Sequence, residues 1–160
     1  FFTEPQSFSL GERALKVPGL DGSGKMVKSE GNAIYLIDDE KTISKKVMRA
    51  VTDAGPTEPN SEKPEPIQNL FTLMEIVSTP EVYQHFDGLY NDCAIRYGDM
   101  KKQLAADINA FCAPIRERIL EIQGDKELLS RVARIGAEKA RESASKTIDE
   151  VRHIIGFRPR

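Results

Sequence analysis

Two lysines in a glycine-rich stretch are the residues of this sequence best suited to chemistry. Lys25 and Lys28 lie three positions apart, and glycines surround them at positions 19, 22, 24 and 31. Glycine permits backbone conformations with positive φ and lets N–H groups approach an anion closely. Ammonium groups on such a loop can bind the charged oxygens of a polyphosphate. The stretch is therefore predicted to be a phosphate-binding loop.

A P-loop is one interpretation of this stretch, because its glycines and Lys25 have the spacing of that motif. Met26, which follows Lys25, contradicts the P-loop interpretation, because it occupies the position at which a Ser or Thr hydroxyl would bind Mg²⁺. Gly31 would interrupt the helix that should follow. The connection to the next apolar run, at 33–37, is also shorter than the roughly one dozen residues that a parallel crossover needs. A P-loop is excluded.

The pentapeptide KMVKS at 25–29 resembles the KMSKS signature loop of class I aminoacyl-tRNA synthetases, with Val27 at the position of the central serine. Its flanks, VPGLDG before it and EGN after it, resemble those of bacterial tryptophanyl-tRNA synthetases. Three further stretches resemble the same subfamily in the same order: TISKKVMRAVTD at 42–53, YGDMKKQLA at 97–105 and IIGF at 154–157. The resemblance therefore extends over nearly the whole chain.

The resemblance implies that tryptophan is activated with ATP and Mg²⁺ and then transferred to tRNA(Trp). Lys25 and Lys28 would be catalytic, because they stabilise charge on the leaving pyrophosphate. The whole loop would bind ATP: Lys25, Met26, Val27, Lys28 and Ser29. The Met26 backbone would lie against the nucleotide, and the Ser29 hydroxyl would donate to a phosphate. Val27 cannot donate the hydrogen bond of the family's serine. The sequence itself indicates no metal ligands.

The pattern of apolar residues predicts a mainly α-helical protein. We expect a bundle of about five helices, preceded by an irregular segment with two short strands around the loop. The strands are expected at 14–17 and 33–37, and the helices at 40–53, 67–77, from 80, from 99 to about 122, and from 125 to about 155. Asp38 and Asp39 are candidate N-caps of the first helix, Thr79 of the third, and Pro114 is expected to kink the fourth.

The chain is expected to contain three parts of a class I synthetase with a Rossmann catalytic domain. Residues 1–38 would end the nucleotide-binding catalytic domain, and 39–124 would form a helical domain that binds the tRNA anticodon. Residues 125–160 would form a C-terminal helix that packs back toward the catalytic half. A proline-rich linker is predicted at 54–66. The apolar side of the last helix would lose part of its partner in this chain, so the end of that helix is expected to fray or to pair with a second copy.

Contact with tRNA is predicted for basic and aromatic residues, since unpaired bases are stacked and edge-read by such groups. The candidates on the long helix are Tyr97, Lys101, Lys102, Arg116 and Arg118. The basic face of the helix at 40–53 is a second candidate, with Lys41, Lys45, Lys46 and Arg49. Simple solvation of each side chain is the alternative.

Class I enzymes carry a His-x-Gly-His motif in an upstream Rossmann half, and neither His85 nor His153 belongs to such a motif. The family's tryptophan pocket also lies upstream. The chain, which begins with Phe1, is therefore expected to be a carboxy-terminal fragment that is inactive alone. The resemblance implies a homodimer for the full-length enzyme.

The composition is that of an ordinary soluble protein, with 39% hydrophobic residues and a net charge of −2. That charge argues against general affinity for nucleic acid, so RNA contact must come from a local surface. There is no apolar run of about 18 residues for a membrane span and no leader, so a cytoplasmic location is expected. Two alternatives stay open: a helical interaction module with an incidental lysine loop, or another class I synthetase such as the tyrosyl enzyme.

Overall fold

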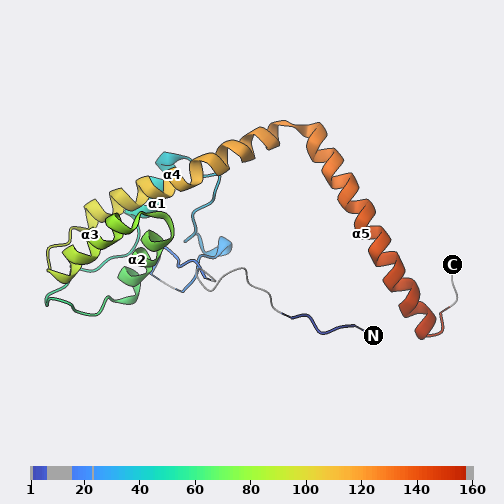
Figure 1. Cartoon of the computed structure of the whole chain (residues 1–160), viewed down its shortest axis with the longest axis horizontal. Coiled ribbons are helices and arrows are strands. Elements are labelled where there is room, and N and C mark those ends of the chain that lie inside the picture. The colour runs from blue at the N-terminus through green and yellow to red at the C-terminus, as the bar shows by residue number, and fades with distance from the viewer. Residues whose placement is uncertain (1, 7–15, 23, 158–160) are drawn as a thin grey trace. The chain divides into compact units, whose positions relative to one another are not determined.

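The computed structural model describes residues 2–6, 16–22 and 24–157, and the chain divides into two compact units, Phe1–Arg116 and Glu117–Arg160 (Figure 1). Among the described residues it is mainly helical, with five α-helices in the predicted order. They are α1 (Glu40–Met48), α2 (Glu65–Val77), α3 (Pro80–Asn91), α4 (Tyr97–Gly124) and α5 (Lys126–Ile154), and a short 3-10 helix, η1 (Lys28–Glu30), precedes them. The predicted fold class is confirmed.

The strand predicted at 33–37 is wrong, because these residues form an irregular segment that ends in a turn. The Tyr35 N–H donates to the Asp38 side chain at 2.9 Å, and the Asp38 N–H donates back to the Tyr35 carbonyl at 2.9 Å. These bonds close a turn and use groups that a strand ladder would need. Of the strand predicted at 14–17, residues 14 and 15 lie outside the described part, and 16–17 are irregular beside an isolated bridge between Pro18 and Lys25.

The first helix begins as predicted and ends early. The Asp39 side chain caps α1 by accepting from the Thr42 N–H at 2.7 Å, and this hydrogen bond lowers the pKa of Asp39. The helix stops at Met48 rather than near residue 53. Beyond it the Val51 N–H donates to the Leu20 carbonyl at 3.1 Å, so a partner distant in the sequence replaces the helical hydrogen bond.

The core of the first unit lies among α1, α2, α3 and α4. Its fully buried large side chains are Ile43 and Val47 of α1, Ile67, Leu70, Phe71 and Met74 of α2, Tyr90 of α3, and Met100 and Leu104 of α4. The Phe71 ring makes edge contacts with Tyr83 and Tyr90 of α3, with centroids 5.7 and 6.0 Å apart. Such edge-to-face pairs stabilise a core beyond the area they bury. The core thus holds together the four helices that follow the lysine loop.

The proline-rich segment at 54–66 is fixed to this core by Lys63. Its ammonium lies 4.7 Å from the ring centroids of both Phe71 and Tyr90 and 2.7 Å from the Asp87 carboxylate. No helix crosses the prolines, as predicted, although α2 begins at Glu65, with Pro66 in its first turn. The segment is therefore anchored, and is not a free linker.

Replacing Lys63 with methionine is expected to lower the free energy of unfolding by about 1–2 kcal/mol, because two cation–π contacts and a partly buried ion pair are lost. Urea unfolding followed by circular dichroism measures this change. Lys146→Met is the matched control, since it removes only an exposed ion pair with Glu142 on α5. Equal losses in the two variants would contradict the anchoring role of Lys63.

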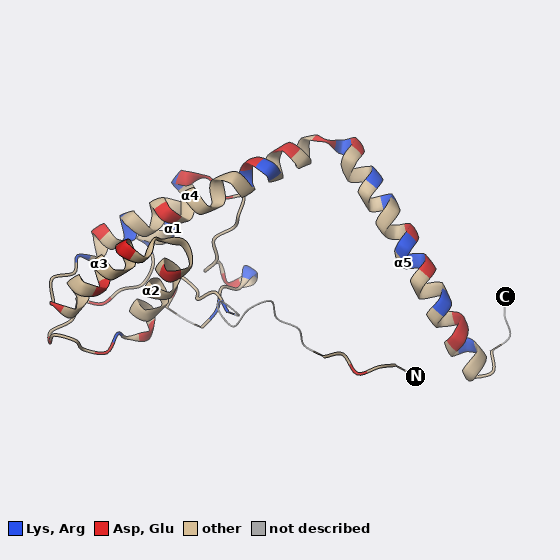
Figure 2. Cartoon of the chain, in the orientation of Figure 1, with Lys and Arg blue, Asp and Glu red and all other residues tan. Residues whose placement is uncertain are grey.

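The second unit contains the end of α4 and α5. Asp125 caps α5 as predicted, with its side chain accepting from the Leu128 N–H at 2.8 Å. The apolar side of this helix is not covered, because α5 has no buried residue; Val132, for example, is 58% exposed. Periodicity shows that one side of a helix is apolar but does not show what covers it. Lys, Arg, Asp and Glu are interspersed along α5 (Figure 2), and none of the described helices is long and apolar enough to cross a membrane.

Candidate functional site

The lysine loop is held at its base by backbone hydrogen bonds. The Met26 N–H donates to the Val17 carbonyl at 2.7 Å, beside the bridge between Pro18 and Lys25. Lys28 begins the 3-10 helix η1, and its C-cap Gly31 has a φ of 69°, a left-handed conformation that favours glycine. Lys25 and Lys28 are both exposed, and among the described residues neither forms an ion pair. Two exposed ammonium groups without an ion-pair partner among the described residues therefore extend from this loop.

One buried amide, Asn32, connects several parts of this loop. Its side-chain oxygen accepts from the Val27 N–H at 2.8 Å, and its nitrogen donates to the Asp21 carboxylate at 3.1 Å and the Lys25 carbonyl at 3.3 Å. Asn32 is only 5% exposed. Sequence reasoning placed it only in a flank of the signature, because nothing in the local pattern shows that an asparagine side chain turns back into a loop.

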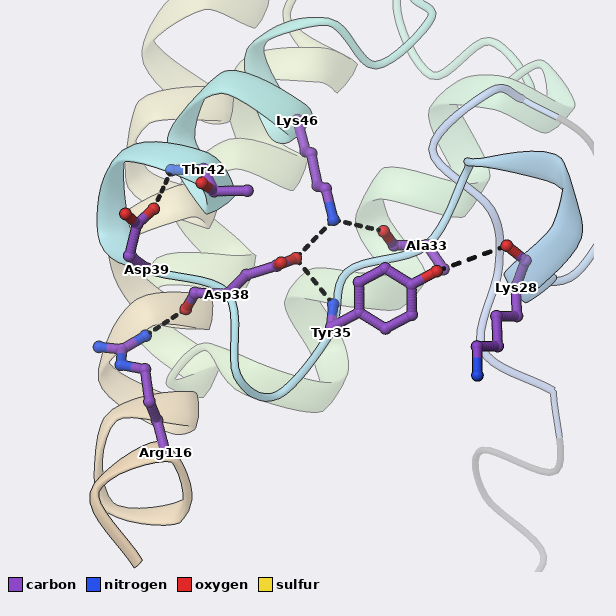
Figure 3. A network of polar contacts seen from close by, with 8 residues as sticks. All are labelled: Lys28, Ala33, Tyr35, Asp38, Asp39, Thr42, Lys46 and Arg116. Carbon is purple, nitrogen blue, oxygen red and sulfur yellow. Dashed lines mark hydrogen bonds and ion pairs between the residues drawn. The ribbon is translucent and has the colours of Figure 1, made fainter. Parts of the chain in front are cut away.

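A polar network joins the loop to the start of α1 (Figure 3). The Tyr35 hydroxyl donates to the Lys28 carbonyl at 3.4 Å, and the Tyr35 ring lies 4.6 Å from the Lys46 ammonium. Lys46 in turn donates to the Asp38 carboxylate at 2.5 Å and to the Ala33 carbonyl at 3.0 Å. The segment at 33–38 that replaces the predicted strand is therefore held by α1.

The same network reaches α4 through Arg116. The Arg116 guanidinium donates to the Asp38 carbonyl at 2.6 Å (Figure 3). It also donates to the Asn109 side chain at 3.0 Å. A continuous series of hydrogen bonds thus connects the backbone of Lys28 to the long helix. Sequence reasoning missed this role of Arg116, since the Asp38 carbonyl is 78 positions away in the sequence.

The predicted tRNA-contacting residues of α4 have different environments. Lys102 and Arg118 are exposed and paired with Asp99 and Glu121 within the helix. Arg116 is half-buried in the network above.

Lys101 points into the protein. It is 8% exposed, and its ammonium donates to the Ala50 carbonyl at 2.7 Å and to the Thr52 hydroxyl at 3.0 Å. Burial lowers the pKa of this ammonium. These bonds cap the backbone that leaves α1, so Lys101 binds α4 to the end of α1.

Tyr97 is the remaining candidate. Its hydroxyl is buried and lacks a hydrogen bond of good geometry among the described residues. Burial and then the nearby Asp53 carboxylate raise the pKa of this phenol. The side chains of Lys41 and Lys45 on α1 and of Arg49, just after it, are exposed, whereas Lys46 is held in the network around Asp38.

An apolar cavity of about 600 Å³ lies beside the loop. Among the described residues that line it, Lys16 and Lys25 are the two charged ones. The remainder of the lining comes from the segments around the loop and from α2 and α4: Val17, Met26, Ala33, Ile34, Leu36, Leu73, Ile76, Val77, Ile108, Phe111 and Cys112. An apolar wall next to ammonium groups is suited to a ligand with a flat apolar part and an anionic part.

The sequence of the chain matches a protein family and several curated proteins. The family model described as tRNA synthetases class I (W and Y) matches residues 1–113. The curated tryptophan–tRNA ligase of Porphyromonas gingivalis is 75% identical over 158 residues, which are 99% of this chain and 48% of that protein. The tryptophan–tRNA ligase of Neisseria meningitidis is 35% identical over 99% of this chain and 46% of its own length.

Solved structures give the same result. The tryptophanyl-tRNA synthetase from Campylobacter jejuni, complexed with ADP and tryptophan, superposes with a TM-score of 0.71 at 28% identity, over 92% of this chain and 45% of that one. The chain thus spans about half the length of the relatives that it matches. Together with the lysine loop and the helices that follow it, these matches show that the chain belongs to the class I tRNA synthetases of the tryptophan and tyrosine group.

Proposed function

We propose that the complete protein is a tryptophan–tRNA ligase, in which this chain supplies the ATP-binding loop and the tRNA-binding helices. The observation that carries the proposal is the KMVKS loop, with both ammonium groups exposed, in a chain 75% identical to such a ligase. In the reaction, a carboxylate oxygen of tryptophan forms a bond to the α-phosphorus of ATP, and the bond from that phosphorus to the bridging oxygen breaks. Pyrophosphate leaves, and the tryptophanyl group then passes to tRNA.

Lys25 and Lys28 would stabilise the negative charge that grows on the pyrophosphate, as preorganised cations do in other phosphoryl chemistry. The N–H groups of Met26 and Val27 are already engaged with Val17 and Asn32. The phosphates would therefore be contacted by the side chains of Lys25, Lys28 and Ser29. Met26, which also lines the apolar cavity, would contact the apolar part of the nucleotide.

ATP would enter this reaction with Mg²⁺. Within the described residues there is no group of three or more His, Cys, Asp or Glu side chains that could hold a metal ion. No Mg²⁺ ligand is therefore proposed among the described residues.

We propose that tRNA is contacted by exposed side chains, which can reach it without first leaving the protein core. Lys102 and Arg118 on α4 meet this condition, because exposed ion pairs such as theirs are worth little and are easily exchanged for phosphate. Lys41 and Lys45 on α1 and Arg49, which follows it, are also exposed. Tyr97, Lys101 and Arg116 would instead stabilise the helices that carry these exposed side chains.

The remaining proposals concern the complete protein. Residues 1–38 would form the end of its catalytic domain, and 39–124 would form the domain that binds the anticodon. Residues 125–160 would pack toward the catalytic half. The protein would be a cytoplasmic homodimer, and its tryptophan pocket would lie in the half that precedes this chain. These proposals are supported by the family resemblance.

A chimera tests the proposed function directly. The matching segment of the Porphyromonas gingivalis ligase is replaced with this chain, and ATP–pyrophosphate exchange is measured with tryptophan or tyrosine. We expect exchange that depends on tryptophan, together with charging of tRNA(Trp), at rates within about tenfold of the parent ligase. The 160-residue chain alone is expected to show no exchange.

Each alternative has a distinct outcome in this experiment. A folded chimera without exchange would overturn the ligase proposal and favour a helical interaction module. Exchange that depends on tyrosine would indicate the tyrosyl enzyme. Exchange by the isolated chain would contradict the location of the tryptophan pocket outside it.

A further inference from the structure

The amide of Asn32 is buried and contacts the backbone of the KMVKS loop at Lys25 and Val27. Its oxygen accepts the Val27 N–H at 2.8 Å, and its nitrogen donates to the Lys25 carbonyl at 3.3 Å and to Asp21 at 3.1 Å. Only one orientation of the amide satisfies these partners. The amide oxygen must face the Val27 N–H, and the amide nitrogen must face the two acceptors, Lys25 and Asp21. The backbone of Asn32 takes part as well, because its carbonyl accepts the Leu20 N–H at 3.1 Å.

Gly19 provides independent evidence that this arrangement is tightly packed. A Cβ at position 19 would lie 2.6 Å from the Asn32 amide nitrogen and 2.6 Å from an Asp21 carboxylate oxygen. Both distances are far shorter than van der Waals contact, so the pair of side chains requires glycine at this position. The backbone at Gly19, the Asp21 carboxylate and the Asn32 amide therefore form one packed unit under the loop.

The two backbone groups that Asn32 binds lie within the pentapeptide itself. One belongs to Lys25, and the other, the Val27 N–H, immediately precedes Lys28. Fixing both groups limits the freedom of the backbone from which the two ammonium groups extend. Neither lysine has an ion-pair partner among the described residues, so the backbone is what restrains their positions.

We propose that Asn32 is a positioning residue of the ATP loop: its amide, oriented by Asp21, holds the backbone of Lys25 and Val27 so that the two lysines are correctly spaced before ATP binds. This inference rests on the proposed ATP-binding function of the loop. Asn32 itself does not touch the reacting atoms. It acts on rate because a displacement of about 1 Å in a catalytic group can cost a factor of about 100.

The first test uses the 160-residue chain and needs no activity. Exchange of the Val27 amide hydrogen, followed by NMR, is expected to be slow in the unaltered chain and at least about tenfold faster in Asn32→Ala, with exchange in the core of α4 unchanged. A Val27 amide that exchanges equally fast in both proteins would overturn the proposal.

The second test uses the chimera and separates positioning from folding. In Asn32→Ala we expect the single-turnover rate of adenylate formation to fall by about 100-fold, while the KM for tryptophan and the burst amplitude stay the same. A merely structural role would lower the amplitude, since fewer molecules would be folded, and would leave the rate constant unchanged. That result would contradict the proposal.

Exchanging the two side chains provides the sharpest control. Asn32→Asp keeps an acceptor for Val27 but places a carboxylate against Asp21, so its rate should be at least as low as that of Asn32→Ala. In the double variant Asp21→Asn/Asn32→Asp, the amide at position 21 can donate to the carboxylate at 32, and at least about tenfold of the rate should return. A double variant no faster than Asn32→Asp would contradict the pairing.

Asn91→Ala is the matched control, because it removes an amide–carboxylate bond of the same kind, to Asp87 at 3.1 Å on α3, far from the loop in sequence. Its rate should equal that of the unaltered chimera. An inactive unaltered chimera would count against the proposed function, and with it the catalytic role of Asn32, whereas unprotected Val27 or an unchanged Asn32→Ala rate would count against the positioning role alone.

Discussion

Replacing Lys28 with alanine in the complete enzyme is expected to slow tryptophanyl-adenylate formation by roughly 100- to 1,000-fold, or about 3–4 kcal/mol. The Lys28 ammonium is exposed and has no ion pair among the described residues, so its charge is available to an incoming polyphosphate. The charge that it meets grows as pyrophosphate leaves, and an interaction that strengthens in the transition state acts on the rate. The KM for tryptophan is expected to change little.

Single-turnover kinetics in the chimera measure this effect, with a tryptophan titration beside them. Lys139→Ala, which removes an exposed lysine of α5, is the control and should retain the full rate. Val27→Ser should be close to neutral or mildly activating, because the Val27 N–H is held by Asn32 whichever side chain is present. A Lys28→Ala variant that loses tryptophan affinity and rate equally would exclude the transition-state role.

Amide exchange in α5 of the 160-residue chain is expected to be faster than in the core of α4 by several orders of magnitude at low micromolar concentration. No side chain of α5 is buried, and Ile148, Ile154 and Ile155 are 45%, 63% and 60% exposed. A helix without tertiary packing is only marginally stable in water, whereas buried helices open with free energies near that of global unfolding. Met100 and Leu104 of α4, both fully buried, provide the reference.

Hydrogen exchange with mass spectrometry, repeated over a hundredfold range of protein concentration, measures this difference. Protection that rises with concentration would show that a second copy covers the apolar side of α5. Strong protection of 147–155 that does not depend on concentration would contradict the prediction and show that this side is covered within one chain.

The sequence alone determined features that depend on neighbouring residues. Asp39 and Asp125 cap their helices as predicted, because a capping side chain reaches an N–H only three residues away. Thr79 and Pro80 likewise begin α3. The KMVKS loop was recognised in the same way, since its residue types and spacing lie within one short stretch. The number and order of the helices followed from apolar periodicity.

The tertiary structure decided what depends on distant partners. The run at 33–37 has strand-like composition, but its backbone groups bond within a turn and to Lys46 of α1. The sequence pattern indicated that Lys101 is a surface lysine. In the structure its ammonium is buried, because it donates to the Ala50 carbonyl just after α1, 51 positions away in the sequence. The Asn32 side chain likewise bonds residues that are not its neighbours, Val27 and Lys25, which are five and seven positions away. Most buried polar groups have a hydrogen-bond partner, and which partner lies within reach is determined only when the chain has folded.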